Sequence, residues 1–390
     1  MKLSLSLPLR PSPSPFTAHT HTHTHNLPFK IPTNYPPFLL PVIKCSSWPN
    51  LKAIAKKRKK GLEDLSDELY KFSSFNLDHA PARRQVRSAF IDFHQKLDHV
   101  LFKFAPHGIR TEEEIFCKSW LPKEGDQIKG LVCFCHGYGD TCTFLFEGIA
   151  RRIAGSGYAV YAVDHPGFGL SDGLHGYISN FDDLVDNVIE QYAKIKERPE
   201  LQGLPRFIFG QSMGGAVALR THLKEPDQWD GMILVAPMCR VAEEVMPPAA
   251  VLQVANILAN VIPEVKFFPT KDLAELAFRN LKYRKLAYYN MICYSDRVRL
   301  KTAMEILRVT REIESNVNKV RSPLLVIHGA ADMVTDPNVS KFLYEKACSK
   351  DKTLKLYKGG YHSILEGEPD DTIFTVFDDI VQWLDARCSS

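Results

Sequence analysis

Short apolar runs, rich in β-branched and aromatic residues, recur along the chain from about residue 114. They are EIFCKSW at 114–120, GLVCFCHG at 130–137, YAVYAVD at 158–164, RFIFG at 206–210, GMILVAP at 231–237, PLLVIHG at 323–329 and TLKLYKG at 353–359. Helix-length segments separate most of the later runs, as at 181–197. Strands that alternate with helices predict an α/β fold with a mostly parallel central sheet and helices on both faces. In such sheets, ligands bind at the carboxyl ends of the strands.

A helical pattern precedes the first of these runs. Residues 81–104 carry apolar side chains at Val86, Phe90, Phe93, Leu97 and Leu101, the three and four spacing of an amphipathic helix. We therefore expect a helical extension at 61–104, followed by the main domain at 105–390.

A long insertion separates GMILVAP from PLLVIHG, far longer than a connection between neighbouring strands needs. Helical patterns fill it at 251–262, 272–290 and 300–317. We expect a helical cap at about 239–318 that gives the site an apolar wall. The aromatic residues Phe267, Phe268, Tyr288 and Tyr289 could flank an aromatic substrate there. The alternative is a set of extra core helices with no contact to substrate.

The first 60 residues have a different composition. Residues 1–62 contain ten Lys or Arg and no Asp or Glu, with abundant Ser, Thr and Pro. The segment lacks apolar periodicity, and prolines interrupt any secretory signal. We expect 1–60 to be a disordered plastid transit peptide and linker, with a cytoplasmic protein as the alternative. Its His/Thr run at 19–25 is interpreted as a low-complexity spacer.

Composition narrows the classes of function. The chain has 390 residues, 45% hydrophobic and 24% charged, which suits one large globular domain. Its net charge of +4 arises from the first segment, so the remainder gives no support for a nucleic-acid partner. The nine cysteines form no CxxC pair, and no metal or organic cofactor is implied. No apolar stretch is long enough to span a bilayer.

The segment FIFGQSMGGAV at 207–217 places a serine directly after a strand, with glycines two residues away on each side. Small neighbours are required where a strand turns sharply into a helix and exposes a strained serine. Ser212 is therefore the candidate nucleophile, with Gly210 and Gly214 as part of the same turn.

A serine needs a base that a carboxylate holds in one tautomer. His362 follows the last strand, and Asp332 follows the strand at 323–329, so both lie at the same sheet edge as Ser212. Asp336 is the rival carboxylate, but Asp336 and Pro337 are typical of a helix start. The chain order Ser, Asp, His is the one expected of an α/β-hydrolase.

An oxyanion also needs backbone donors. Met213, directly after the nucleophile, supplies one N–H, and Tyr138 in HGYGD supplies the other. His136 and His328 are interpreted as histidines that order loops. The pair His222 and Asp227 has the spacing of some acyltransferases, and we interpret it as a coincidence.

The motifs HGYGDT, DHPGFGLSDG, GQSMGG, HGAADMVTDP and GGYHSILEGE together resemble the monoacylglycerol lipase group of α/β-hydrolases, in particular its plant branch, which includes lysophospholipases and caffeoylshikimate esterases. The resemblance covers about residues 105–387. It implies an α/β-hydrolase fold with a helical cap insertion. It also implies a serine esterase with Ser212 as nucleophile, His362 as base and Asp332 as its orienting group. In the animal enzymes a glutamate that receives glycerol follows the His-Gly-x-Gly stretch. Asp140, one methylene shorter, stands there as the substrate-binding candidate.

Three functions remain open. The first is hydrolysis of a monoacylglycerol or related lysolipid, with possible membrane contact through the cap. The second is the same chemistry on an aromatic ester such as caffeoyl shikimate. The third is a small-molecule receptor of the same fold, which the complete Ser212, Asp332 and His362 set disfavours.

Overall fold

The computed structural model describes residues 62, 65–103, 111–112, 115–241, 246–268 and 272–388. The predicted transit segment at 1–60 lies outside these residues. Within the described part of the chain, no helix is both long and apolar enough to cross a membrane.

An eight-stranded sheet forms the centre, in the order β1-β2-β4-β3-β5-β6-β9-β10. Its strands are β1 (Thr111–Glu112), β2 (Cys117–Trp120), β3 (Gly130–Cys135), β4 (Tyr158–Val163), β5 (Arg206–Gln211), β6 (Gly231–Val235), β9 (Leu324–Gly329) and β10 (Lys352–Tyr357). All pairings from β4 to β10 are parallel, and β1 and β2 are antiparallel. Each of the seven apolar runs overlaps a strand, so the predicted α/β fold with a mostly parallel sheet is confirmed.

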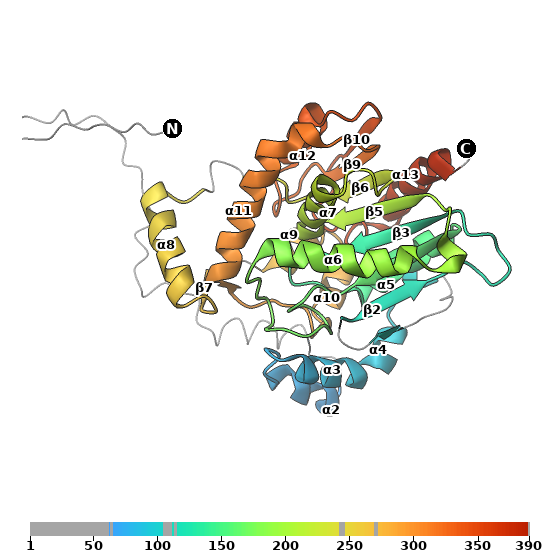
Figure 1. Ribbon diagram of the computed structural model, residues 1–390. Coiled ribbons are helices and arrows are strands. Elements are labelled where there is room, and N and C mark those ends of the chain that lie inside the picture. Colours follow the sequence, from blue (N-terminus) through green and yellow to red (C-terminus); the bar gives the residue numbers. More distant parts are fainter. Residues whose placement is uncertain are drawn as a thin grey trace, which may run out of the picture. The chain divides into compact units, whose positions relative to one another are not determined.

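Helices cover both faces of this sheet (Figure 1). The flanking helices are α5 (Leu145–Ala154), α6 (Phe181–Lys196), α7 (Met213–Lys224), α12 (Pro337–Lys346) and α13 (Asp370–Cys388). Phe134 and Phe209 pack in one buried cluster with α5 and α13, whereas Cys133 and Ile208 pack in the other with α6, α7 and α12. Neighbouring residues of β3 and β5 thus alternate between two apolar layers, which explains why these strands read as continuous apolar runs. No disulfide joins any two cysteines of the described residues.

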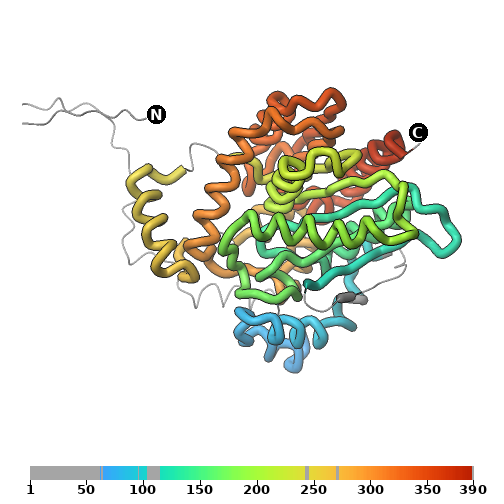
Figure 2. The backbone as a smooth tube through the Cα atoms, viewed as in Figure 1, coloured from blue at the N-terminus to red at the C-terminus, as the bar shows by residue number. Residues whose placement is uncertain are grey.

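The N-terminal extension consists of short helices (Figure 2, blue). They are α2 (Asp67–Tyr70), η2 (Lys71–Ser74), α3 (Ala80–Ala89), α4 (Ile91–Gln95) and η3 (Val100–Lys103). The prediction of one continuous amphipathic helix over 81–104 was therefore wrong, because three separate helices lie there. The backbone leaves helical geometry at Phe90, with φ −99° and ψ 2°, and at Lys96, with φ −99° and ψ 14°. The apolar positions still face inward, since Val86, Phe90 and Leu101 are buried.

The insertion contains α8 (Ala249–Val261), β7 (Lys266–Phe268), α9 (Leu273–Ala277), α10 (Leu281–Ala287), β8 (Val298–Arg299) and α11 (Leu300–Asn316). The expected helix at 272–290 is thus two helices. β7 and β8 pair as a separate two-stranded sheet. α8 packs beside α11 through Ala255, Ala259 and Leu300 (Figure 1).

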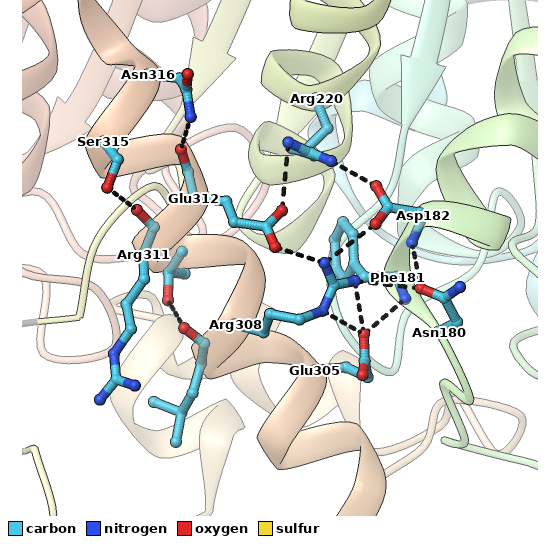
Figure 3. Close-up of polar contacts among 12 residues, drawn as sticks. Asn180, Phe181, Asp182, Arg220, Glu305, Arg308, Arg311, Glu312, Ser315 and Asn316 are labelled. Carbon is cyan, nitrogen blue, oxygen red and sulfur yellow. Dashed lines mark hydrogen bonds and ion pairs between the residues drawn. The ribbon is translucent and has the colours of Figure 1, made fainter. Parts of the chain in front are cut away.

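A charged network joins α11 to α6 and α7 (Figure 3). Arg308 of α11 pairs with Asp182 of α6 at 3.0 Å and with Glu312 at 2.7 Å. Arg220 of α7 pairs with the same two carboxylates, at 2.5 and 3.3 Å. Val309 of α11 also belongs to the apolar layer that contains Cys133 and Ile208. α11 is therefore packed into the core, and contact of the insertion with a substrate stays a prediction.

Candidate active site

The serine turn joins β5 to α7. Ser212 has φ 53° and ψ −120°, a positive φ that is rare for a residue with a side chain. A Cβ atom at Gly210 would lie 2.3 Å from the carbonyl oxygen of Gly214, and one at Gly214 would lie 1.9 Å from that of Cys135. No side chain fits at either position. The glycines on both sides of the serine are therefore required by backbone contacts, as the sequence predicted.

Backbone hydrogen bonds fix the position of this turn. The N–H of Ser212 donates to the carbonyl of Val235, the last residue of β6, at 3.0 Å. Its carbonyl accepts from the N–H groups of Gly215 and Met238, each at 2.9 Å. The backbone of Ser212 is thus held by the end of β6 and the segment that follows it. These hydrogen bonds do not involve the Ser212 hydroxyl.

His362 and Asp332 form a hydrogen-bonded pair. Nδ1 of His362, in the loop after β10, lies 2.6 Å from Oδ2 of Asp332, in the loop after β9. Both side chains are buried. Because Nδ1–H donates to the carboxylate, Nε2 is the nitrogen of His362 that can accept a proton.

Several donors surround the Asp332 carboxylate. Oδ1 accepts from the N–H groups of Val334 at 2.7 Å and Thr335 at 3.1 Å. Oδ2 lies 2.9 Å from both Nε2 of His328 and the hydroxyl of Thr335. Burial alone raises the pKa of this carboxyl, but the hydrogen bonds from His328 and His362 outweigh it and hold the pKa of Asp332 well below its usual range. Asp332 is therefore a carboxylate throughout the neutral range.

The rival carboxylate has a different environment. Asp336 is the N-cap of α12, and its Oδ1 accepts from the N–H of Asn338 at 2.8 Å. Of the two candidates, Asp332 is the one in contact with His362.

His328, expected to order a loop, also contacts Ser340 through Nδ1 at 2.7 Å. Its hydrogen bond to Asp332 was not predicted.

The end of β6 connects the serine turn to this pair. Ala236 follows Val235, the residue that anchors Ser212, and its carbonyl oxygen lies 3.2 Å from the Thr335 hydroxyl. Thr335 in turn contacts Asp332 and His362. Thus residues that follow four strands, β5, β6, β9 and β10, are held together at one sheet edge.

The predicted oxyanion donors lie on the two segments beside the serine. A Cβ on Gly137 would be 3.3 Å from Cβ of Ser212, so the loop at 136–140 lies against the nucleophile. Tyr138 is the next residue of that loop. Met213 is the first residue of α7, where an N–H has no acceptor within its own helix. This placement is suited to a pair of backbone donors.

The loop at 136–140 is fixed from both sides. The carbonyl of Gly139 accepts from the N–H of Tyr294 in the insertion at 2.7 Å. Nε2 of His136 accepts from the N–H of His165 at 2.9 Å, and its Nδ1 lies 2.8 Å from the carbonyl of Gly137. His136 thus orders the loop, as expected from the sequence.

Two further carboxyl groups lie near the site. Asp140, the expected substrate-binding residue, accepts from the N–H of Thr141 at 2.8 Å, and burial raises its pKa. Glu366, four residues after His362, is buried and was not predicted. Its Oε1 lies 3.3 Å from Nε2 of Gln211. Burial, followed by the charge of Asp140, raises the pKa of Glu366 to about 8. Nothing in the local sequence distinguishes this glutamate from a surface residue.

His222 and Asp227 both contact Arg321, in the segment that precedes β9. The N–H of Arg321 donates to Nε2 of His222 at 3.2 Å, and the Arg321 guanidinium pairs with Asp227 at 2.7 Å. His222 is ten residues from Ser212 along α7, or about 15 Å at 1.5 Å per residue. The acyltransferase-like spacing thus reflects a structural contact away from the serine. Across the described residues, no group of His, Cys, Asp or Glu side chains is arranged to hold a metal ion.

Comparison with known proteins gives consistent results. Residues 126–370 match the family described as serine aminopeptidase, S33. The chain is 35% identical over 275 residues to the caffeoylshikimate esterase of Arabidopsis thaliana, covering 70% of this chain and 82% of that protein. It is 31% identical over 289 residues to human monoglyceride lipase, covering 73% and 91%. The crystal structure of the Paleococcus ferrophilus monoacylglycerol lipase aligns with a TM-score of 0.60 and 25% identity over 70% of this chain and 99% of that one.

The family match spans more than half of the chain, and the fold and the serine turn agree with it. The chain therefore belongs to the serine aminopeptidase S33 family of α/β-hydrolases, as a member similar to the monoacylglycerol lipases and to caffeoylshikimate esterase.

Proposed function

We propose that this protein is a serine carboxylic-ester hydrolase that cleaves a monoacylglycerol or a related lysolipid through an acyl-enzyme. The observation that carries the proposal is the positive-φ Ser212 anchored to the same strand end as the buried His362–Asp332 pair. Relatives named as a monoglyceride lipase and an esterase support the reaction class.

In the first half of the reaction, Nε2 of His362 accepts the hydroxyl proton of Ser212 as the serine oxygen attacks the ester carbonyl carbon. The negative charge that develops on the carbonyl oxygen is stabilised by the N–H groups of Tyr138 and Met213. The bond to the alcohol oxygen then breaks, and His362 gives its proton to the departing alcohol. The acyl group is left on Ser212.

Water completes the cycle. His362 takes a proton from a water molecule, whose oxygen attacks the acyl carbon, and returns that proton to the serine oxygen as the acid is released. Asp332, held as a carboxylate, keeps Nδ1 of His362 protonated and stabilises the imidazolium that forms twice in each turnover. Asp140 is assigned to the alcohol side of the substrate.

Labelling with a fluorophosphonate tests this assignment. Ser212→Ala removes the nucleophile but leaves the backbone bonds of the turn, so the variant should fold normally, fail to label and lose ester hydrolysis by several orders of magnitude. Full stoichiometric labelling of the variant would refute the nucleophile. A wild-type protein that binds an ester without hydrolysing it would favour the receptor interpretation instead.

An aromatic ester is the second candidate substrate, because identity to the caffeoylshikimate esterase reaches 35%. The insertion gives this candidate limited support. Tyr289 is buried, with its ring 4.9 Å from that of Phe93 in the extension, and the hydroxyl of Tyr288 donates to Asp272 at 3.0 Å. Both tyrosines are thus already engaged within the protein. The lipid substrate remains the first proposal.

The exposed face of α8 is proposed to contact the membrane that carries the lipid substrate. Its sequence AAVLQVANILANV has no charged residue. Val251, Val254, Ile257 and Val261 are 53–72% exposed, whereas Ala255 and Ala259 on the other side are buried. An uncharged apolar helix face matches the boundary between headgroups and acyl chains.

Vesicle sedimentation tests the membrane contact. Ile257→Glu should weaken binding to phosphatidylcholine vesicles and raise KM for vesicle-borne monoacylglycerol, with unchanged kcat on a water-soluble ester. Leu281→Glu is the matched control, since Leu281 on α10 is 72% exposed and lies on another helix. Equal loss of vesicle binding in both variants would argue against a specific role of α8.

The plastid is the proposed location. The support is the acid-free, Ser- and Pro-rich composition of residues 1–60, which resembles a transit peptide.

A further inference from the structure

The N-terminal extension, Asp67–Lys103, lies outside the family match at 126–370. It nevertheless contacts the segment after β4, the insertion and the loop that carries His362. These contacts are made by buried polar side chains with defined partners.

Arg83 fixes the extension to the segment after β4. Its side chain is fully buried in α3. It donates to the carbonyls of Gly169 and Ser171, both at 2.6 Å, and to those of Leu77 and Asp78 at 3.0 and 3.2 Å. A guanidinium with this many carbonyl acceptors holds two chain segments in one geometry.

Asp78 joins the extension to the insertion. Its carboxylate accepts from Arg299, the residue before α11, at 2.7 Å and pairs with Lys266 of β7 at 3.2 Å. Arg299 is itself buried and donates to the carbonyls of His175 and Glu264 at 2.9 and 2.7 Å. The base of the insertion is thus held by the extension.

His99 joins the extension to the loop after β10. Nε2 lies 2.8 Å from the carbonyl oxygen of Glu366, and Nδ1 lies 3.2 Å from the N–H of Leu101. These partners require one neutral tautomer, with the proton on Nε2. Burial lowers the pKa of His99 to about 4, in agreement with a neutral ring. The ring also packs against Tyr283 of the insertion, with centroids 4.0 Å apart.

Glu366 closes the turn that follows the base. The N–H groups of Glu366 and Gly367 both donate to the carbonyl of Ser363, the residue after His362, at 3.2 and 2.6 Å. The Glu366 side chain contacts Gln211, the residue before Ser212. A continuous set of contacts therefore leads from His99 through Glu366 to Ser363, next to His362, and to Gln211, next to Ser212.

We propose that the extension supports the geometry of the active site. In this role, His99 is a positioning residue for the turn that carries His362. The proposal rests on the function proposed above. Without the His99 donor, the buried carbonyl of Glu366 has lost its partner, and the turn relaxes to find another. Because a displacement of about 1 Å at a reacting group can cost about 100-fold in rate, even a small shift of His362 lowers turnover.

Three variants of the full chain test this role. His99→Phe keeps a ring against Tyr283 but removes the donor. His99→Gln restores an N–H at the position of Nε2. His222→Phe is the matched control, because His222 is also fully buried, bonded through both ring nitrogens and about 15 Å from Ser212. If His99→Phe does not fold, His99→Asn, whose shorter amide does not reach Glu366, replaces it.

The measurements are kcat and KM on a water-soluble ester, the rate of fluorophosphonate labelling, and the thermal midpoint. We expect His99→Phe to lower kcat and the labelling rate at least tenfold with KM within twofold, and His99→Gln to recover most of the loss. His222→Phe should lower the midpoint without changing kcat per labelled site. A kcat for His99→Phe within twofold of wild type, or an equal loss in His222→Phe, overturns the positioning role alone. Absence of labelling in the wild-type protein refutes the proposed function as well.

Discussion

Replacement of Asp332 by asparagine keeps the size of the side chain and removes one charge. In the structure this carboxylate has five donors, of which the closest is Nδ1 of His362 at 2.6 Å. An amide offers only one oxygen, and its NH2 group cannot accept a hydrogen bond from Nδ1–H. If that group faces His362, the ring is driven to the other tautomer, with its proton on Nε2, where it no longer accepts from Ser212.

The expected effect is large. In serine proteases the same replacement of the orienting aspartate lowers kcat by about 10⁴-fold, or about 5.4 kcal/mol at 1.36 kcal/mol per factor of ten. We expect a loss of that order here, with KM little changed, because Asp332 contacts His362 and His328 but is not assigned to substrate binding. The pKa shift also predicts reduced stability. Asp332 titrates at lower pH in the folded chain, so its contribution is present above the usual aspartate pKa and lost as pH falls below it.

Asp336→Asn is the matched control, four residues away. Asparagine and aspartate are equally good N-caps, so this variant should retain both kcat and stability, whereas Asp336→Ala should lose about 1 kcal/mol of stability. Turnover is measured on a p-nitrophenyl ester, with active sites counted by fluorophosphonate and folding checked by circular dichroism. If Asp336→Asn is the more damaging of the two in folded protein, or if Asp332→Asn loses less than tenfold, our choice of the orienting carboxylate is wrong.

Three other predictions concern the pH dependence of stability, the substrate class and the location of the protein. Because the pKa of Glu366 is raised to about 8, the folded chain binds more protons than the unfolded chain above the usual glutamate pKa, and stability falls as pH rises toward 8. Glu366→Gln should therefore be more stable than wild type at pH 8.5 and lose that advantage at pH 5, and a pH-independent difference in unfolding midpoint would contradict this. On substrate class, kcat/KM should be at least about tenfold higher for monoacylglycerol or lysophospholipid than for caffeoyl shikimate, a margin of about 1.4 kcal/mol, since each buried methylene of an acyl chain contributes about 0.8 kcal/mol. Equal or reversed values in one side-by-side assay would put the aromatic ester first. Finally, residues 1–60 fused to a fluorescent protein should carry it into plastids, and a diffuse cytosolic signal would count against import.

The sheet could be predicted because its central strands are buried on both faces. Runs such as 131–135 and 324–327 then contain few polar interruptions, and each was recognisable alone. β1, β7 and β8 are two or three residues long, too short to show any pattern. The breaks at Phe90 and Lys96 were missed because the apolar spacing continues through them. Periodicity reports which side chains are buried, and it does not report backbone continuity.

The candidate site residues Ser212, Asp332 and His362 could be singled out from the sequence because each follows a strand with a distinctive local motif. The serine turn requires its glycines, and Asp336 with Pro337 is recognisable as a helix start. The supporting residues carry no such signal. His99 and Glu366 are separated by 267 positions and meet only in the folded chain. His328 is one of 14 histidines, and its contact with Asp332 depends on the geometry of the loop after β9.

The two ends of the insertion are held to the rest of the protein with different strength. α11 joins α6 and α7 through Arg308 and Arg220, in a network where each partly exposed pair contributes up to about 1 kcal/mol, and it buries Val309 as well. α8 packs mainly through two alanines and exposes most of its larger side chains. Alanines bury little apolar area, so a displacement of α8 from α11 costs far less than a displacement of α11 from the core. If the proposed acyl chain requires the insertion to move, we therefore expect α8 to move and α11 to stay fixed on the core.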